Sequence, residues 1–474
     1  MAATPRQAQG DRHHYTAAWI SAGALLLALF AVMLAISPRF VYGGLPVLER
    51  PIYTLVALMM AAGAVYLLAL LLLRRQAAPG RAWWVWVLGV GLGMRLLMLP
   101  SVPMLETDYY RYLWDGAVAA AGHNPFIHPP RAIREGDAPE PLLELAAESG
   151  LVIERVTHPQ LATIYPPVSQ AAFAAAHRVA PWRIEGLRLV FLAFDIIALG
   201  LLVLLLKRLA LPAAGVVVYW WNPLLVKEVY NSTHMEIVVV AFLAAGLLLV
   251  VSRRWLLSSV ALGLAAGAKL WPALLLPVMA RQRGLSWGRF GVMALVFAAV
   301  CLAVTLPLLW QMHRGESGLS AYAGQWQVNA GLFQVIHAGA GLLPVKDVQA
   351  TARLIVAALV VVWVIWLCRR PAPDGRAVCE RALWATAALF MLAPAQYPWY
   401  WLWLLPMLVV RRSLGLLLLT ALLPLYYLRF PLRELELKPW FDHGVVWLQY
   451  APALALLVWE CRRSTPAVEG DGRT

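Results

Sequence analysis

Residues 52–73 read IYTLVALMMAAGAVYLLALLLL, an apolar run without one charged side chain. A helix of about 20 apolar residues is long enough to cross the hydrocarbon core of a bilayer. Comparable runs recur at 17–37, 186–206, 290–310 and 350–367. These runs lack the alternation of apolar and polar residues that marks a membrane β-barrel. Helices also satisfy every backbone hydrogen bond in lipid. The sequence therefore predicts an all-α integral membrane protein.

The composition of the whole chain agrees with this prediction. Of 474 residues, 61% are hydrophobic and 14% are charged, whereas an ordinary soluble domain has about 25% charged residues. The first apolar run, residues 17–37, is too long for the apolar part of a secretory signal peptide, and no clear cleavage site follows it. We therefore expect this run to be a membrane anchor.

Much of the positive charge lies in short loops between apolar runs, and the net charge is +14. The basic residues of these loops are Arg74, Arg75, Arg81, Lys207, Arg208, Arg253, Arg254, Arg281, Arg283, Arg289, Arg369, Arg370, Arg376, Arg381, Arg411, Arg412, Arg462 and Arg463. Cytoplasmic loops are enriched in Lys and Arg, so we place these loops and both termini in the cytoplasm. Charge distributed in this way argues against a nucleic-acid partner and for the lipid bilayer.

The segments that then face outward are 101–164, 230–233, 311–349, 395–399 and 429–443. None of the four cysteines lies in the two long outer loops, so no disulfide framework is expected there.

This topology corresponds to about 12–14 transmembrane helices. The predicted organisation is a single transmembrane domain, 17–461, between cytoplasmic tails at 1–16 and 462–474, with long outer loops at 101–164 and 311–349.

Two stretches do not fit a simple series of crossings. Residues 167–180 form a short Ala-rich helix that is predicted to be re-entrant or interfacial. Residues 255–279 have basic loops on both sides, so this stretch must cross twice or turn back, and Lys269-Leu-Trp-Pro272 is the expected break. Irregular backbone at membrane depth is tolerated where it lines a cavity, so a pocket is expected at Lys269.

The first outer loop holds a dense group of polar and aromatic residues, ETDYYRYLWDG at 106–116. It predicts an amphipathic helix at the outer membrane interface that begins at Asp108, ends at Gly122 and is stopped by Pro125.

Asp108, Arg111 and Asp115 share one face of this helix. A structural explanation is that Asp108 caps the helix and Arg111 pairs with Asp115, and we prefer this explanation for Asp115. For Asp108 we prefer a catalytic role, because a cap does not need Glu106 and a row of tyrosines beside it. Tyrosines of that row, Tyr109 and Tyr112, are then candidate substrate-binding residues.

Charged residues within the apolar runs are the second group of candidates. Lys269 is costly in lipid, so its ammonium either extends to the membrane surface or pairs with a neighbouring acid such as Asp195 or with the phosphate of a lipid substrate. We prefer the phosphate. Asp195 itself is expected to join two helices. Arg95 either extends to the membrane surface or contacts phosphate.

The motif NSTHME, residues 231–236, places His234 and Glu236 at the outer start of a helix. Thr233 and Glu236 also match a capping box, which is an equally good structural explanation.

Aromatic and amide side chains of the other outer segments are candidates for sugar binding. Tyr165, in Tyr165-Pro-Pro167, precedes a helix that proline starts well. Gln325, Trp326 and Asn329 lie in the second long loop, and Tyr397 and Trp399 lie in a third segment. Anchoring at the membrane interface explains the aromatic residues equally well. Nucleotide-binding fingerprints and defensible metal-ligand spacings are absent from the sequence, so neither a nucleotide cofactor nor a metal is expected.

Six motifs together resemble bacterial glycosyltransferases of the C-type fold, most closely the mannosyltransferases that depend on polyprenol-phosphate mannose. The motifs are ETDYYRYLWDGAVAAAGHNPF at 106–126, HPQLATIYPP at 158–167, NSTHME at 231–236, AGAKLWPALLLP at 266–277, QWQVNAGLF at 325–333 and QYPWYWLWLLP at 396–406. In that group an acidic residue of the first outer loop is the catalytic base, which corresponds to Asp108. Relatives more often carry His-Asn-Asp where this chain has His234-Met235-Glu236.

The resemblance implies transfer of a hexose, most simply mannose, from a polyprenyl-phosphate carrier to a hydroxyl of a lipid- or glycan-type acceptor, with inversion, at the periplasmic face of a bacterial inner membrane. A phosphate leaving group needs a cation and no general acid, so one base, Asp108, suffices. Glu106 and His234 would support the base, and Lys269 with Arg95 or Arg111 would bind phosphate. The alternative is a transporter or flippase, which predicts inverted repeats with matching broken helices.

Overall fold

The computed structural model describes residues 5–73, 80–314, 324 and 326–464, and in this part of the chain the structure is helical. Two isolated β-bridges, Gln282 with Ala372 and Val328 with Ala395, join loops. Among these residues, seven helices are long and apolar enough to cross a membrane: Thr16–Phe40, Ile52–Leu73, Ile184–Arg208, Trp287–Leu306, Val348–Cys368, Leu414–Glu434 and Lys438–Arg463. Shorter apolar helices are Glu236–Val251, Trp255–Ala268 and Trp271–Ala280. The prediction of an all-α membrane protein with multiple transmembrane helices is confirmed.

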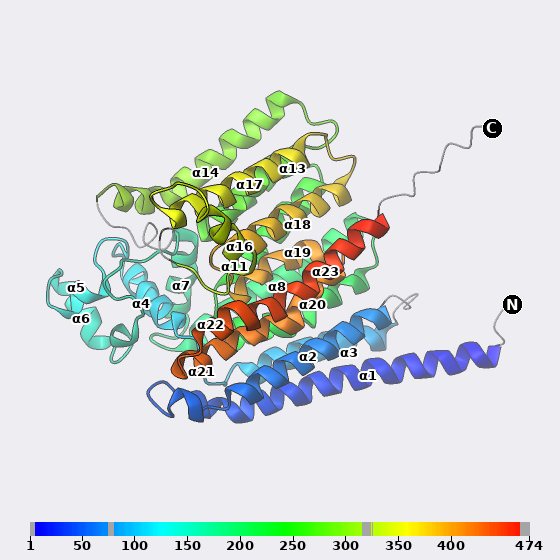
Figure 1. The fold of residues 1–474 in the computed structure, drawn as a ribbon, viewed down its shortest axis with the longest axis horizontal. Helices are drawn as coiled ribbons and strands as arrows, with labels where there is room; N and C mark the ends of the chain where they lie inside the picture. Colours follow the sequence, from blue (N-terminus) through cyan, green and yellow to red (C-terminus); the bar gives the residue numbers. More distant parts are fainter. Residues whose placement is uncertain (1–4, 74–79, 315–323, 325, 465–474) are drawn as a thin grey trace.

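The helices follow one another along the chain with few long connections (Figure 1). The α-helices are α1 (Pro5–Ile36), α2 (Ile52–Leu73), α3 (Arg81–Met98), α4 (Asp108–Ala120), α5 (Pro130–Arg134), α6 (Glu140–Glu148), α7 (Pro167–Val179), α8 (Ile184–Arg208), α9 (Val217–Trp220), α10 (Pro223–Val226), α11 (Glu236–Val251), α12 (Trp255–Ala268), α13 (Leu276–Ala280), α14 (Trp287–Arg314), α16 (Gly331–Ala340), α17 (Val348–Cys368), α18 (Gly375–Leu392), α19 (Leu405–Leu408), α20 (Leu414–Leu422), α21 (Arg429–Glu434), α22 (Lys438–Trp440) and α23 (Val446–Ser464).

Short 3-10 and π-helices connect or extend these elements. The 3-10 helices are η1 (Ser37–Phe40), η2 (Val47–Glu49), η3 (Ile153–Arg155), η4 (Ala213–Val216), η6 (Trp271–Leu275), η7 (Pro398–Leu404) and η8 (Leu423–Leu428). The π-helices are η5 (Lys227–Asn231) and η9 (Phe441–Val445). Helix α1 begins at Pro5, within the segment predicted as an N-terminal tail. Residues 1–4, 74–79, 315–323, 325 and 465–474 lie outside the described residues. They include Arg74 and Arg75 of the first basic loop, parts of both predicted tails, part of the second outer loop and Gln325.

The basic loops meet at one end of the helix bundle. The Arg283 N–H donates to Ala372 O at 2.9 Å, Arg281 Nε donates to Cys368 O at 3.1 Å, and Arg411 pairs with Glu380 at 3.1 Å. The start of α1 and the end of α23 lie at the same end, whereas α4, α5, α6 and α7 lie at the opposite end (Figure 1). This arrangement agrees with a topology that places the basic loops on one side of the membrane and the first long loop on the other.

The break predicted at Lys269 is present. Helix α12 ends at Ala268, Lys269 is extended with φ −157° and ψ 133°, and η6 and α13 follow. The 281–283 loop that comes next is bonded to 368–372, at the end with the other basic loops. The stretch therefore turns back, and the turn leaves the Lys269 side chain in a cavity.

Helix α4 forms as predicted but in a different environment. It ends in a Schellman motif, in which His123 N–H donates to Val118 O at 3.0 Å and Gly122 takes φ +83°. However, residues 109–118 are buried, so the helix does not lie on a surface. It packs on α7, and its N-cap is Thr107, with Asp108 as the first helical residue. The explanation of Asp108 as a cap is therefore wrong.

Candidate functional site

A cavity of about 490 Å³ lies between the α4–α7 layer and the irregular helices of the bundle. All six motifs quoted above contribute lining residues, and η8 and α21 contribute others. The polar and aromatic lining residues are Glu106, Thr107, Asp108, Arg111, Tyr112, Thr157, His158, Tyr165, Glu236, Lys269, Trp271, Trp326, Tyr397, Trp399, Tyr400, Trp403, Tyr426, Arg429 and Phe430. The fold thus brings together residues as far apart in the sequence as Leu105 and Phe430.

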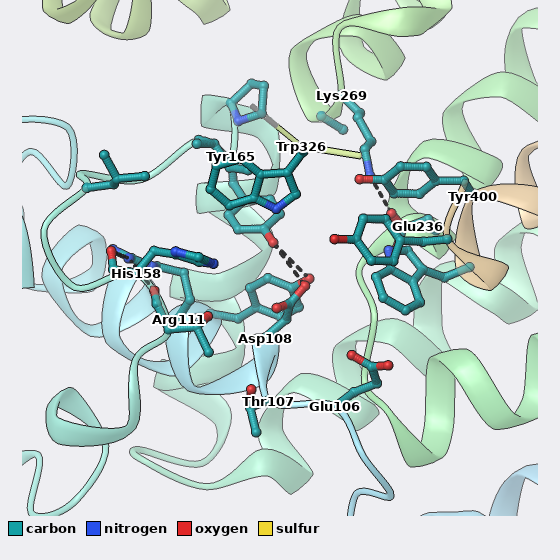
Figure 2. Close-up of a pocket in the computed structure, with 18 of the residues that line it drawn as sticks. Glu106, Thr107, Asp108, Arg111, His158, Tyr165, Glu236, Lys269, Trp326 and Tyr400 are labelled. Carbon is teal, nitrogen blue, oxygen red and sulfur yellow. Dashed lines mark hydrogen bonds and ion pairs between the residues drawn. The ribbon is translucent and has the colours of Figure 1, made fainter. Parts of the chain in front are cut away.

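Asp108 faces the middle of this cavity (Figure 2). Its position at the start of α4 directs the carboxylate away from the helix, and 33% of the side chain is exposed. Tyr165 O–H donates to Asp108 Oδ2 at 3.4 Å. Burial raises the pKa of the Asp108 carboxyl above its ordinary value, while Lys269, Tyr165 and Arg111 oppose this shift. A carboxylate with a raised pKa is a stronger base than a free one.

Glu106 lies beside Asp108 on the same wall (Figure 2). Burial raises the pKa of the Glu106 carboxyl well above its ordinary value, and the negative charge of Asp108 acts in the same direction. Two neighbouring carboxyl groups in one buried site do not both ionise readily. This arrangement favours a neutral Glu106 next to an ionised Asp108.

Lys269 lies across the cavity from Asp108 (Figure 2). Its Nζ is 2.5 Å from Glu236 Oε1 and 3.9 Å from the centre of the Tyr400 ring. The alternative of a neighbouring acid as partner is correct, but the acid is Glu236 and not Asp195. The Lys269 side chain is 22% exposed, so the ammonium remains accessible from the cavity.

Arg111 and His158 form the wall on the side of the first outer loop (Figure 2). Arg111 Nη2 donates to Thr157 O and His158 O, both at 3.0 Å. The predicted Arg111–Asp115 ion pair is not formed; Asp115 accepts a hydrogen bond from Gln170 Nε2 at 3.2 Å. The His158 ring contacts Trp326 edge to face, with ring centres 4.8 Å apart.

The aromatic candidates divide between the cavity and the core. Tyr112, Tyr165, Trp326, Tyr397 and Trp399 line the cavity. Tyr109 does not; it is buried against Tyr110, with ring centres 4.2 Å apart.

His234 lies directly behind Asp108 and is fully buried. Its Nδ1 is 3.9 Å from Asp108 Oδ2, and its ring stacks on Trp399 at 3.7 Å with an interplanar angle of 17°. It supports the wall of the cavity rather than lining it. The capping box predicted from Thr233 to Glu236 is absent: the N-cap is Met235, and Thr233 Oγ1 accepts from Arg188 Nε at 3.1 Å.

Two predicted site residues lie elsewhere. Arg95 is fully buried, and its Nε lies 2.6 Å from Asp195 Oδ2. This ion pair joins α3 to α8, which is the role expected for Asp195. Arg95 is therefore not available to a phosphate in the cavity. Asn329 lines a separate cavity of about 630 Å³. Its Nδ2 donates to Gln396 O and Gln449 Oε1, which fixes the second outer loop to the bundle.

Arg429 was not predicted as a residue of the site, although its place in the sequence indicates a functional role. It lines both cavities, and its Nη1 donates to Tyr426 O–H at 2.6 Å. An arginine in a segment predicted to face outward departs from the positive-inside pattern, and such a departure indicates a function other than orientation.

Among the residues that the structure describes, no group of three or more His, Cys, Asp or Glu side chains could hold a metal ion. The polar chemistry of the cavity consists of carboxylates, cations and aromatic rings. A helical membrane protein with such a cavity at the end opposite its basic loops has the architecture of a C-type membrane glycosyltransferase.

Comparison with known proteins identifies the family. The chain belongs to the alpha-(1->6)-mannopyranosyltransferase family, whose N-terminal domain matches residues 17–283. It is 27% identical over 405 residues, 79% of this chain and 74% of the relative, to alpha-(1->6)-mannopyranosyltransferase A of Mycobacterium tuberculosis. No solved structure matches this chain significantly. The prediction of a membrane mannosyltransferase is confirmed.

Proposed function

We propose that this protein transfers a mannosyl residue from a polyprenyl-phosphate carrier to an acceptor hydroxyl, with inversion at the anomeric carbon and with Asp108 as the general base. The observation that carries the proposal is the placement of Asp108 and Lys269 on facing walls of one cavity (Figure 2). The family match favours an enzyme over the alternative of a transporter or flippase. By similarity to the relative, the bond formed is an α-(1→6) mannosidic bond.

The proposed reaction needs one base and one cation. Asp108 takes the proton of the acceptor hydroxyl as that oxygen attacks the anomeric carbon, and the bond to phosphate breaks with its electron pair on the phosphate oxygen. Lys269 stabilises the phosphate that departs. Because the leaving group is already an anion, no general acid is required.

Other residues of the cavity support the binding of both substrates. Trp271 and Trp403 stack next to Lys269 with ring centres 4.9 Å apart. Leu270, which lines the cavity next to Lys269, is 41% exposed, and we propose that the isoprenoid chain packs on this apolar surface. Arg111, His158 and Trp326 on the other side of Asp108 are proposed to bind the acceptor. The positive-inside pattern favours a cavity that faces the periplasm of a bacterial inner membrane.

The test is mannosyl transfer by purified protein from radiolabelled polyprenyl-phosphate mannose to a synthetic alkyl α-mannoside. Asp108→Asn removes the base and keeps the shape, so turnover is expected to fall by about 10²–10⁴-fold. Asp137→Asn, an exposed position in the same outer loop, is the matched control and should have wild-type turnover. Wild-type turnover by a folded Asp108→Asn protein would exclude Asp108 as the base.

A further inference from the structure

The buried His234 lies between Asp108, which lines the cavity, and the buried Glu228. His234 Nδ1 is 3.9 Å from Asp108 Oδ2, and His234 Nε2 is 3.6 Å from Glu228 Oε2. Within the described residues, neither imidazole nitrogen has a hydrogen-bond partner, and neither does Glu228 Oε2. Buried polar atoms are nearly always paired in folded proteins. The imidazole therefore lies between two carboxyl groups, and each of its nitrogens is within 4 Å of a carboxyl oxygen.

The other carboxyl oxygen of Glu228, Oε1, has two partners that hold the side chain in place. Tyr427 O–H donates to Glu228 Oε1 at 2.7 Å, and Lys227 Nζ is 3.5 Å from the same oxygen. Lys227 Nζ also donates to Tyr427 O–H and to Ser232 Oγ. Because Tyr427 O–H accepts from Lys227, its own hydrogen must point to Glu228. The π-helix η5 carries both Lys227 and Glu228, and all of these side chains are buried.

The orientation of the His234 ring is fixed as well. The ring stacks on Trp399, which in turn stacks on Tyr397 with ring centres 4.4 Å apart. The backbone N–H of His234 donates to Glu228 O at 2.9 Å. The plane of the His234 ring and its backbone are therefore both held, and the proton is on one of the two ring nitrogens.

We propose that Glu228 is a positioning residue for Asp108 that acts through His234. This inference rests on the proposed role of Asp108 as the base. A neutral imidazole has one donor nitrogen and one acceptor nitrogen. The Glu228 carboxylate keeps the proton on Nε2, so the Nδ1 lone pair faces Asp108. When Asp108 takes the proton of the acceptor hydroxyl, its new O–H is directed to Nδ1, which stabilises the protonated base.

Glu228→Gln tests the inference because the structure dictates how the amide must lie. Tyr427 O–H requires an acceptor at the Oε1 position, so the amide oxygen stays there and the NH2 group faces His234 Nε2. Nε2 then becomes an acceptor, and the proton moves to Nδ1, where it stabilises ionised Asp108. We expect kcat to fall by about 10- to 100-fold, KM to change little, and the acid limb of kcat/KM to move to lower pH.

The acid limb of kcat/KM is interpreted together with the other charged and titratable groups around His234. These groups are Glu106, Arg111 and Tyr165 near Asp108, Lys227 and Tyr427 near Glu228, and Lys269 with Glu236 across the cavity. None of these side chains is altered by Glu228→Gln.

A double-mutant cycle separates action through His234 from a simple effect of charge. His234→Phe keeps the stacking on Trp399 and removes both nitrogens. If Glu228 acts through His234, then Glu228→Gln has no further effect on kcat in the His234→Phe protein, whereas a direct effect of charge on Asp108 would persist. Multiplicative losses in the double variant, or an unchanged kcat in folded Glu228→Gln protein, would overturn the inference.

Tyr427→Phe provides a second route if Glu228→Gln does not fold. It removes the hydrogen bond that fixes Glu228 Oε1 and keeps the ring, so kcat should fall in the same direction by a smaller factor. Wild-type kcat in this variant would overturn the inference. Failure of the proposed function itself is distinguishable, because it would appear as wild-type turnover in the Asp108→Asn protein.

Discussion

At the scale of single residues, buried charges are paired in ways that the sequence does not specify. Lys269 needs a partner in an apolar environment, and the sequence offers both Asp195 and Glu236. The structure pairs Lys269 with Glu236 and Arg95 with Asp195. The choice depends on which helices are neighbours, and local hydropathy contains no information about that. The sequence therefore predicted Lys269 correctly as a cavity residue and placed Arg95 wrongly in the same site.

The ionisation of Asp108 leads to a prediction at this scale. Burial raises the pKa of the Asp108 carboxyl, and the positive charge of Arg111 is among the effects that lower it. A base must be ionised, so kcat/KM should fall as the pH drops through the pKa of Asp108, which burial raises above its ordinary value. Arg111→Gln keeps donors for Thr157 O and His158 O but removes the charge. The acid limb of kcat/KM should therefore move to higher pH.

The measurement is kcat/KM as a function of pH for both proteins with the same donor and acceptor. Asp137→Asn, which alters an exposed carboxylate of the same loop, should leave the acid limb in place. An acid limb that stays fixed or moves to lower pH in Arg111→Gln would contradict the assignment of that limb to Asp108.

At the scale of elements, the sequence predicted helix boundaries correctly where a capping glycine, a proline or a buried charge marks the end of a helix. Helix α4 ends at Ala120, just before the left-handed Gly122 that was predicted to stop it. Helix α7 starts at Pro167 and α12 ends at Ala268, next to the break predicted at Lys269. The irregular segments 213–231, 398–408 and 423–428 were not predicted as broken helices. Their side chains are nearly all buried, so they show no periodicity of burial, and proline alone does not show whether a helix bends or ends.

The packing of α4 on α7 positions Asp108 and can be tested at Gly116. A Cβ at Gly116 would lie 2.5 Å from Phe173 O, so Gly116→Ala must push the two helices apart. We expect a loss of stability of about 1–3 kcal/mol together with a lower kcat, because the displaced α4 carries Asp108. Thermal unfolding and turnover of the detergent-solubilised protein measure the two effects.

Gly122→Ala is the matched control on the same helix. Its Cβ would meet nothing within 4 Å, but φ is +83°, so the substitution costs about 1–2 kcal/mol of backbone strain. It should lower the unfolding temperature without changing kcat. If both variants lose kcat in proportion to stability, then the spacing of α4 and α7 has no specific effect on the site.

At the scale of the whole molecule, the distribution of charge predicted how the ends of the bundle are arranged. The basic loops gather at one end and α4–α7 lie at the other (Figure 1). The sequence could not predict the shape of the cavity, because its walls come from segments that no local pattern connects. The number of crossings, about 12–14 by hydropathy, stays a prediction, since seven helices in the described part meet the criteria of length and apolar character.

The orientation of the molecule in the membrane follows from the same charges and can be measured with cysteine labelling. Asp137→Cys lies in the first outer loop and Arg254→Cys lies in a basic loop, and both positions are exposed. In cells stripped of any outer membrane, a membrane-impermeant maleimide should label the Asp137→Cys protein and should label the Arg254→Cys protein only after permeabilisation. The native protein provides the background, because Cys368, Cys379 and Cys461 lie near the basic end and Cys301 lies within α14. Labelling of Arg254→Cys in intact cells would place the cavity on the cytoplasmic side, and the proposed periplasmic reaction would then be wrong.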